Sequence, residues 1–331
     1  MKLSILDQAP ISSGQTAQEA LKDSITLAQH GERLGYHRYW IAEHHDLFGL
    51  ACPNPDVMLG VIGSQTTTIK IGAGAVLLPY YKPFRVAETY NLLATLFPER
   101  IDLGIGRAPG GSAEVSMALS NNYLEQVRHY ADDIDELIKF LHTDFPKAHM
   151  YGKITPTPVP TTPPHVWLLG TSDKSAVLAA EKRINYAFGH FMTDSNGPNI
   201  VQTYRDQFKT DNNASPYVIV AVHVICADTT AKAEELALSS LLWSIQQEKN
   251  IDHLNIPSIE EAKQYTYTKE DQEKMSDMKQ KMIIGNPEKV KKEIEDIQSL
   301  YKADEMMIIT ITHNKEAARH SYRLIAEQLG T

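Results

Sequence analysis

Four titratable side chains follow one another at Glu43, His44, His45 and Asp46, immediately after the apolar run 39–42. That run predicts a short buried strand. Charged and imidazole groups at the end of a buried strand are costly unless they are solvated, paired or used in function. Because ligands of parallel α/β proteins bind at the carboxyl ends of the strands, this segment is a candidate site for proton exchange or for hydrogen bonding to a ligand.

The two histidines leave more than one interpretation open. Adjacent residues on an extended strand point to opposite sides, so at most one of His44 and His45 would face a central site. This weakens a two-histidine metal site, and neither an HExxH motif nor another carboxylate–histidine spacing completes a ligand set. Two alternatives remain: a general acid or base at one imidazole, or a loop histidine hydrogen-bonded to Glu43 or Asp46.

A glycine-rich segment, 101–111, ends another apolar run and contains a single cation, Arg107. Its G-x-G-x-x-x-G spacing differs from the dinucleotide-binding fingerprint, and no helix is expected directly after it. Glycine lets the backbone approach an anion closely, and arginine can donate paired N–H groups to a phosphate or carboxylate. The alternative is a tight exit from the strand.

The segment 166–181 predicts a second anion site. A buried strand ends at Gly170, and Thr171 and Ser172 begin a helix that carries Ser175 in its first turn. Free backbone N–H groups, the positive end of the helix dipole and three hydroxyl groups suit a phosphate. Simple N-capping by Ser172 explains the same residues. Two such loops, each after a strand, favour a phosphorylated ligand more than either does alone.

Two glycines, Gly72 and Gly74, lie inside a further strand-like segment, 71–85. Glycine weakens a strand interior and often marks a bulge or a ligand pressed against the backbone. A planar ring system would fit there. Close packing of a helix on the outer face is the alternative.

Strand-like and helix-like segments alternate along nearly the whole chain. About eight strand–helix units in 331 residues predict one (β/α)8 TIM-barrel domain spanning residues 1–331, with insertions at the carboxyl ends of the strands. A doubly wound sheet would need a switch point that the pattern lacks. The expected strands are 3–6, 39–42, 69–78, 101–105, 166–169, 186–188, 217–226 and 305–310.

Two segments interrupt the alternation. Five prolines in 151–164 predict an irregular insertion. The polar, tyrosine-bearing segment 250–282 is expected to be a mobile lid over the barrel mouth or a solvated excursion.

Composition argues against several classes of protein. The formal net charge of −9 disfavours a nucleic-acid binder or a protein that binds anionic membranes. The two cysteines, Cys52 and Cys226, lack CxxC spacing, so a disulfide framework or structural zinc site is not expected. A G-x-S-x-G nucleophile motif is absent. The amino terminus lacks a signal-peptide pattern, and no apolar stretch approaches membrane-spanning length, so we expect a cytoplasmic protein.

The segments described above, in this order, resemble the bacterial-luciferase-like flavin monooxygenases nearly end to end. The similar segments are AEHHDLFG (42–49), GAGAVLLPYYKPFRVAE (72–88), FPERIDLGIGRAPGG (97–111), VWLLGTSDKSAVLAAE (166–181) and IIGNPEKVKKEIEDI (283–297). The first four are specific in combination. Arg107 is followed by Ala-Pro-Gly-Gly, as in the non-luminescent branch, and Ile105 stands where the luciferases have cysteine. Light emission is therefore not implied. The coenzyme F420 branch is less similar.

The resemblance implies reduced FMN bound at the carboxyl ends of the barrel strands. Its phosphate would lie near Arg107 and the 170–175 turn, where the matching residues are Gly170, Thr171, Ser172 and Ser175. The isoalloxazine would lie near the Gly74–Ala75 bond, which is commonly a cis peptide in the family. His44 matches the imidazole beside the reactive edge of the flavin.

The implied activity is that of an FMN-dependent monooxygenase. It would take reduced flavin from a separate NAD(P)H-dependent flavin reductase and use O2, through a peroxyflavin, to oxidise a small organic substrate. His44 would supply or remove a proton. Family members commonly pair through outer barrel helices, so we expect a homodimer with contributions from helices around 56–67 and 84–96. The alternative is a flavin-binding storage protein of the same fold.

Overall fold

Eight parallel strands form a closed barrel in the structure, a computed structural model that describes residues 1–193, 195–210, 214–249 and 255–330. Each strand pairs with the next around the ring, β9 pairs with both β1 and β7, and the β6–β7 pairing completes the closure. The predicted TIM barrel is therefore confirmed. The barrel strands are β1 (Lys2–Asp7), β2 (Arg38–Ile41), β3 (Lys70–Leu77), β4 (Ile101–Gly106), β5 (His165–Gly170), β6 (Asn185–Gly189), β7 (Val218–Cys226) and β9 (Glu305–Ile309).

A ninth strand, β8 (Met282–Gly285), lies outside the barrel and was not predicted. The first part of β7 pairs with β9 over Ile219–His223, whereas its last part pairs with β8 over His223–Cys226. β8 has only four residues and follows a long polar segment, so its sequence is too short to show the periodicity on which a strand prediction depends. The long β7 thus leaves the barrel wall near His223 and continues beside β8.

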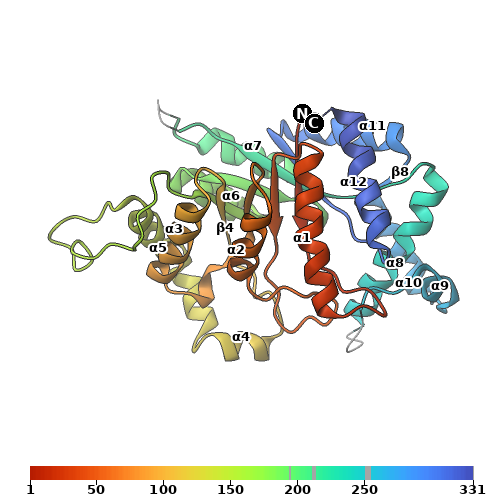
Figure 1. Ribbon diagram of the computed structural model, residues 1–331, viewed down its shortest axis with the longest axis horizontal. Helices are drawn as coiled ribbons and strands as arrows, with labels where there is room; N and C mark the ends of the chain where they lie inside the picture. Colours follow the sequence, from red (N-terminus) through yellow and green to blue (C-terminus); the bar gives the residue numbers. More distant parts are fainter. Residues whose placement is uncertain (194, 211–213, 250–254, 331) are drawn as a thin grey trace.

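Helices surround the barrel (Figure 1). Side chains of Thr16, Asn54 and Ser172 cap the amino ends of three of them, and proline occupies the first turn of several others, as helix starts commonly require. The helices that follow barrel strands are α1 (Ala17–Arg33), α2 (Pro55–Gln65), α3 (Pro83–Leu96), α5 (Tyr123–His142), α6 (Asp173–Lys182), α7 (Gly197–Gln207), α8 (Thr230–Glu248) and α12 (Lys315–Leu329), and α11 (Pro287–Tyr301) follows β8. The remaining helical segments are η1 (Leu78–Tyr80), α4 (Ala113–Leu119), η2 (His190–Met192), α9 (Ile259–Gln264) and α10 (Lys269–Gln280).

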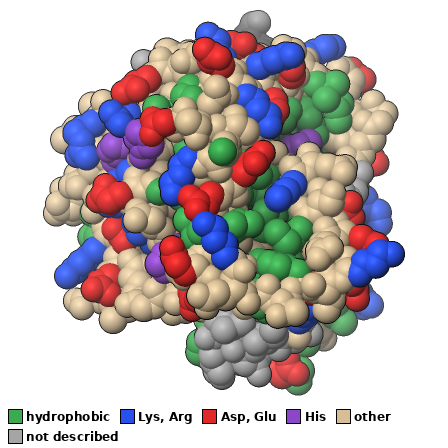
Figure 2. Space-filling model, turned by 90° about the vertical axis from the view of Figure 1, so that its right-hand side faces the viewer, with side chains coloured by type: hydrophobic (Ala, Val, Ile, Leu, Met, Phe, Trp, Pro, Cys, Tyr) green, Lys and Arg blue, Asp and Glu red, His purple; other side chains and the backbone are tan. Residues whose placement is uncertain are grey.

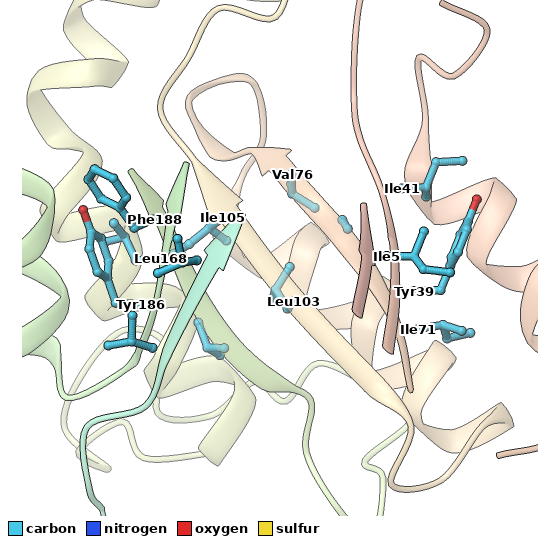
Figure 3. Close-up of a cluster of buried hydrophobic side chains, with 14 of the residues drawn as sticks. Ile5, Tyr39, Ile41, Ile71, Val76, Leu103, Ile105, Leu168, Tyr186 and Phe188 are labelled. Carbon is cyan, nitrogen blue, oxygen red and sulfur yellow. The ribbon is translucent and has the colours of Figure 1, made fainter. Parts of the chain in front are cut away.

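Side chains along the strands alternate between the helix layer and the barrel interior. Outward-facing Ile5, Ile71 and Leu103 are fully buried in the large core beneath the helices (Figure 3). A separate cluster fills the interior, and its members are Leu6, Trp40, Ala42, Trp167, Ala187, Ile219, Ala221, Ile256, Met307, Ile309 and Ile311. The barrel is therefore a packed core with its loops gathered at the carboxyl ends of the strands, at the bottom of Figure 1.

A buried ion network closes the opposite, amino-terminal end of the interior. Arg38 Nη1 lies 2.6 Å from Asp102 Oδ2, and Arg38 Nε lies 2.7 Å from Glu305 Oε1. The indole N–H groups of Trp40 and Trp167 donate to the two oxygens of Asp102 at 3.0 and 3.1 Å. All five side chains are buried. This network was not predicted from the sequence.

The region expected to be a lid contains helices α9 and α10. Before them, Ile256 exchanges backbone hydrogen bonds of 2.8 Å with Ile11 and Ser13, in the loop after β1, and its side chain is fully buried in the interior cluster. Residues 250–254 lie outside the described residues. Mobility of this segment stays a prediction.

The side of the molecule that carries α8–α12 has a mixed surface. Figure 2 shows acidic and basic side chains interspersed there, around a hollow in which hydrophobic side chains gather.

Candidate functional site

Glu43 anchors the loop after β2 at the barrel mouth. The carboxylate is buried and accepts hydrogen bonds from the Leu77 backbone N–H (3.0 Å) and the Tyr81 hydroxyl (2.7 Å). His45 Nε2 lies 2.8 Å from Glu43 Oε1. These contacts tie the end of β2 to the end of β3. Glu43, the first of the two acidic residues in the EHHD sequence, is thus a structural anchor.

The two histidines have different surroundings. The His45 side chain is hydrogen-bonded to Glu43, which is one of the contacts expected for a loop histidine. The His45 backbone N–H donates to the Gly110 carbonyl at 2.8 Å. His44 Nδ1 is buried without a hydrogen-bond partner. Burial, together with the neighbouring His45, lowers the pKa of His44 to about 4. His44 is therefore a neutral imidazole near pH 7, suited to accept or relay a proton.

The Gly74–Ala75 peptide bond is cis, in agreement with the geometry that the resemblance implies. A Cβ at Gly74 would lie 2.8 Å from Leu6 Cδ1, and one at Gly72 would lie 2.6 Å from the Asp102 carbonyl oxygen. The pairing of β3 with β4 shifts register between Ala73 and Val76. An irregularity of the strand, in keeping with the bulge that was one of the two interpretations of these glycines, is thus present, and ligand contact with this backbone stays a prediction. The glycines make room for packing inside the barrel, which corrects the alternative of helix packing on the outer face.

The glycines after β4 serve a contact between two loops. Gly110 has a positive φ of 63°, and a Cβ at Gly111 would lie 2.5 Å from the His45 carbonyl oxygen. A tight turn against the loop after β2 therefore accounts for these two glycines. The loop is held further by two hydroxyl groups that the sequence reasoning missed: Tyr80 donates to the Pro109 carbonyl and Tyr123 to the Arg107 carbonyl, both at 2.6 Å.

Arg107 presents a free cation in this loop. Its side chain is exposed and makes no hydrogen bond or ion pair with the residues that the structure describes. Ile105 on β4 pairs with Leu168 on β5, so Arg107 and Gly170 each follow that pair by two residues. The two loops that the sequence singles out as anion sites therefore begin side by side.

The turn after β5 has the N-cap that the sequence allowed. The Ser172 side chain accepts from the Ser175 backbone N–H, and Ser175 Oγ in turn contacts the Ser172 backbone and lies 2.9 Å from the Tyr186 hydroxyl. A Cβ at Gly170 would lie 2.3 Å from Ser175 Oγ, which explains the glycine. Capping leaves the other backbone N–H groups of the first helical turn without intrahelical partners. Phosphate binding by Thr171, Ser172 and Ser175 stays a prediction.

An opening of about 480 Å³ lies between the segment after β6 and the end of α10. His190, Thr193 and Ser195 line it from one side and Asp277, Gln280 and Lys281 from the other. Within the described residues, no three histidine, cysteine or carboxylate side chains are grouped so that they could hold a metal ion.

Acidification is expected to destabilise the fold through its buried histidines. Burial lowers the pKa of both His44 and His223 from 6.5 to about 4. Above pH 6.5 both are neutral in the folded and unfolded states. Between pH 6.5 and 4 the unfolded chain binds protons that the folded protein does not, so stability falls as the pH falls, by roughly 3 kcal/mol per histidine at most.

Urea unfolding at pH 7 and 4.5 would measure this loss. The double variant His44→Gln/His223→Gln should lose less stability than the unaltered protein over that interval. An equal loss in both proteins would contradict the assignment.

The fold and these loops define an α/β-barrel protein whose polar loops meet at the carboxyl ends of β2, β4 and β5. The family model of the luciferase-like monooxygenases matches residues 1–303, and the chain belongs to that family. Membership indicates a monooxygenase. None of the helices in the described part of the chain is both long and apolar enough to span a membrane.

Relatives of known sequence extend over nearly the whole chain. An uncharacterized protein of Bacillus subtilis, YceB, is 41% identical over 326 residues, covering 98% of each chain. The N-acetyl-S-alkylcysteine monooxygenase of the same organism is 33% identical over 331 residues, covering 99% of this chain and 98% of the relative.

Solved structures show the same fold. The structure of apo-MsnO8 is 31% identical with a TM-score of 0.86, covering 99% of this chain and 97% of that one. The oxygenating constituent of 3,6-diketocamphane monooxygenase from Pseudomonas putida, a type II Baeyer–Villiger enzyme solved with FMN, has a TM-score of 0.72 at 17% identity, covering 99% and 98%.

Proposed function

We propose that this protein is an FMN-dependent monooxygenase that receives reduced flavin from a separate NAD(P)H-dependent reductase and oxidises a small organic substrate with O2. The observation that carries the proposal is the free, exposed Arg107 guanidinium on the loop after β4, because that loop begins side by side with the loop after β5 that leads into α6. A guanidinium and helix N–H groups together suit a phosphate monoester. Family membership and the named monooxygenase relative support the oxygenation chemistry.

The chain's own residues then have distinct tasks. Bound reduced FMN supplies the electrons that activate O2. Arg107 and the 170–175 turn hold the phosphate, and the Gly74–Ala75 segment of β3 supports the ring system. His44, neutral near pH 7 and lacking a partner at Nδ1, takes up or delivers a proton.

Phosphate recognition predicts that the protein binds reduced FMN more tightly than reduced riboflavin. Each charge-assisted contact is expected to contribute roughly 1.5–3 kcal/mol. Arg107→Ala should weaken FMN binding by about tenfold or more without unfolding the protein, because the exposed side chain packs against little. Ser172→Ala should cost less, since the backbone N–H groups persist.

Anaerobic calorimetry with both flavins measures these affinities. Exposed Arg85 offers a matched control, because Arg85→Ala removes one positive charge from α3, as Arg107→Ala removes one from the loop after β4. Equal affinity for the two flavins, or unchanged FMN affinity in both loop variants, would contradict the phosphate site.

We also propose that the protein is a homodimer through α2 and α3. Val57 and Val61 on α2 are 65% and 41% exposed, and Leu92 and Leu96 on α3 are 48% and 58% exposed. Each pair is four residues apart and so forms an apolar stripe on its helix. Light scattering should give twice the mass of the chain at micromolar concentration, and Val61→Asp/Leu92→Asp should give the monomer. A monomeric unaltered protein would refute this assembly.

A further inference from the structure

Tyr123 connects the cation of the proposed phosphate site to a well-anchored helix. It is the first residue of α5, and its hydroxyl donates to the Arg107 carbonyl oxygen at 2.6 Å. The helix has 20 residues, its amino end is capped by Asn122, and its buried residues Ile134 and Leu137 belong to the large core. The hydroxyl therefore holds the Arg107 backbone at a position that the packed core fixes.

The Tyr123 ring is held by its neighbours as well. Its centroid lies 5.2 Å from that of the Tyr80 ring, which in turn lies at right angles to the His45 ring at 6.0 Å. The Tyr80 hydroxyl donates to the Pro109 carbonyl. Two adjoining tyrosines thus hold the loop after β4, and the one at Arg107 is Tyr123. Burial raises the pKa of Tyr123 to about 12, so its hydroxyl stays protonated and donates at neutral pH.

The Arg107 guanidinium lies near the same face of α5 without bonding to it. Burial raises the pKa of both Tyr123 and Tyr130, and at both hydroxyls the positive charge of Arg107 opposes that rise. The two tyrosines are seven residues apart and so lie on one face of the helix. The Arg107 backbone is therefore fixed by Tyr123, while its guanidinium stays available to a ligand.

The local sequence would otherwise leave this loop with much conformational freedom. Residues 107–109 are exposed, and Gly110 and Gly111 follow without side chains that could restrain the backbone. An arginine that binds a phosphate loses conformational entropy, which weakens binding. A hydrogen bond that fixes the arginine backbone before the ligand arrives reduces this cost.

We infer that Tyr123 is a positioning residue for phosphate recognition, which acts by holding the Arg107 backbone so that the guanidinium is already in place when the flavin phosphate binds. This rests on the proposed function, in that it takes the anion to be that phosphate. Tyr123 acts through Arg107 and needs no contact with the ligand. Loss of its hydroxyl should therefore weaken recognition of the phosphate and leave contacts with the rest of the flavin unchanged.

Tyr123→Phe removes the hydroxyl and keeps the ring that packs on Tyr80. Anaerobic calorimetry should show reduced FMN bound about three- to tenfold more weakly than by the unaltered protein, the effect of roughly one hydrogen bond. The affinity for reduced riboflavin, which has no phosphate, should not change. Arg107→Ala/Tyr123→Phe should bind FMN no more weakly than Arg107→Ala alone, because Tyr123 acts only through the arginine.

Tyr267→Phe is a matched control for the loss of a tyrosine hydroxyl. The Tyr267 hydroxyl also donates to a backbone carbonyl, that of Ala262 at 2.9 Å, and both Tyr267 and Tyr123 are half-buried. Tyr267 lies between α9 and α10, away from the loops after β4 and β5. Its substitution should leave the affinities for both flavins unchanged.

The outcomes separate this role of Tyr123 from the proposed function. An unchanged ratio of FMN to riboflavin affinity in Tyr123→Phe would overturn the inference and leave the phosphate site in place. Equal weakening of both flavins would also overturn it, since that indicates general damage to the barrel mouth. Additive losses in the double variant would show that Tyr123 acts independently of Arg107. An unaltered protein that binds the two flavins equally would remove the phosphate site and, with it, the role of Tyr123.

Discussion

Replacement of His44 by alanine is expected to leave FMN binding intact and to reduce substrate-coupled oxygenation by roughly 10²–10⁴-fold, the range for loss of a positioned acid or base. The expected phosphate contacts lie on the loops after β4 and β5, whereas His44 follows β2. Peroxide release should rise as coupling falls, because the reduced flavin still consumes O2. The measurement is substrate-stimulated O2 and NADPH consumption with an added flavin reductase, together with the peroxide yield.

His45→Ala is the matched control for this variant. His45 binds Glu43 and supports the loop, so its loss should lower stability by about 1 kcal/mol and affect coupling less. A greater loss of coupling in His45→Ala than in His44→Ala would reverse the roles of the two residues. If no substrate stimulates turnover and His44→Ala leaves the peroxide yield unchanged, the flavin-storage alternative is favoured.

The barrel could be predicted because its strands are short apolar runs separated by helix-period segments. The runs at 39–42 and 305–310 match β2 and β9 to within one residue at each end. β8 escaped prediction because four residues of Met282–Gly285 carry no period of their own and gain their strand geometry by pairing with the end of β7. Helices α9 and α10 were not predicted because their side chains are mostly polar and show little helical periodicity of apolar residues. Their capping boxes are a stronger sequence signal than that periodicity.

The candidate site was predictable in part. The sequence analysis predicted that the two histidines have different surroundings because adjacent residues of a strand point to opposite sides. However, β2 ends at Ile41, before both histidines. The difference arises instead from the hydrogen bond between His45 and Glu43. The loop role of Gly110 and Gly111 depends on a neighbour more than sixty residues away in the chain, which a local pattern does not contain. His223 was hidden in an apolar strand, although its spacing of two from Ala221 could have placed it on the interior face.

The buried ion network at the amino-terminal end of the barrel interior is the clearest example of a feature that local sequence patterns do not reveal. Arg38, Asp102 and Glu305 stand in three different apolar strands, and each alone reads as an isolated charge. Only closure of the barrel brings them together, since β2 and β4 are separated by β3 and β9 lies on the other side of β1. The sequence signal is a charged residue at the first or second position of an otherwise apolar strand.

Arg38→Met is therefore expected to destabilise the protein by about 3–5 kcal/mol, the usual result of removing one partner from a buried ion network. The guanidinium is the cation shared by Asp102 and Glu305, and its removal leaves two buried carboxylates without that cation. Urea unfolding at pH 7 measures the change. Arg85→Met removes one partner of an exposed ion pair, in which Arg85 lies 3.8 Å from Glu88, and should change stability by less than about 1 kcal/mol.

The triple variant Arg38→Met/Asp102→Asn/Glu305→Gln should recover part of the stability lost in Arg38→Met, because the unpaired charges are gone. If the triple variant is less stable than Arg38→Met alone, packing and hydrogen bonds, and not charge balance, determine the stability of this end of the barrel.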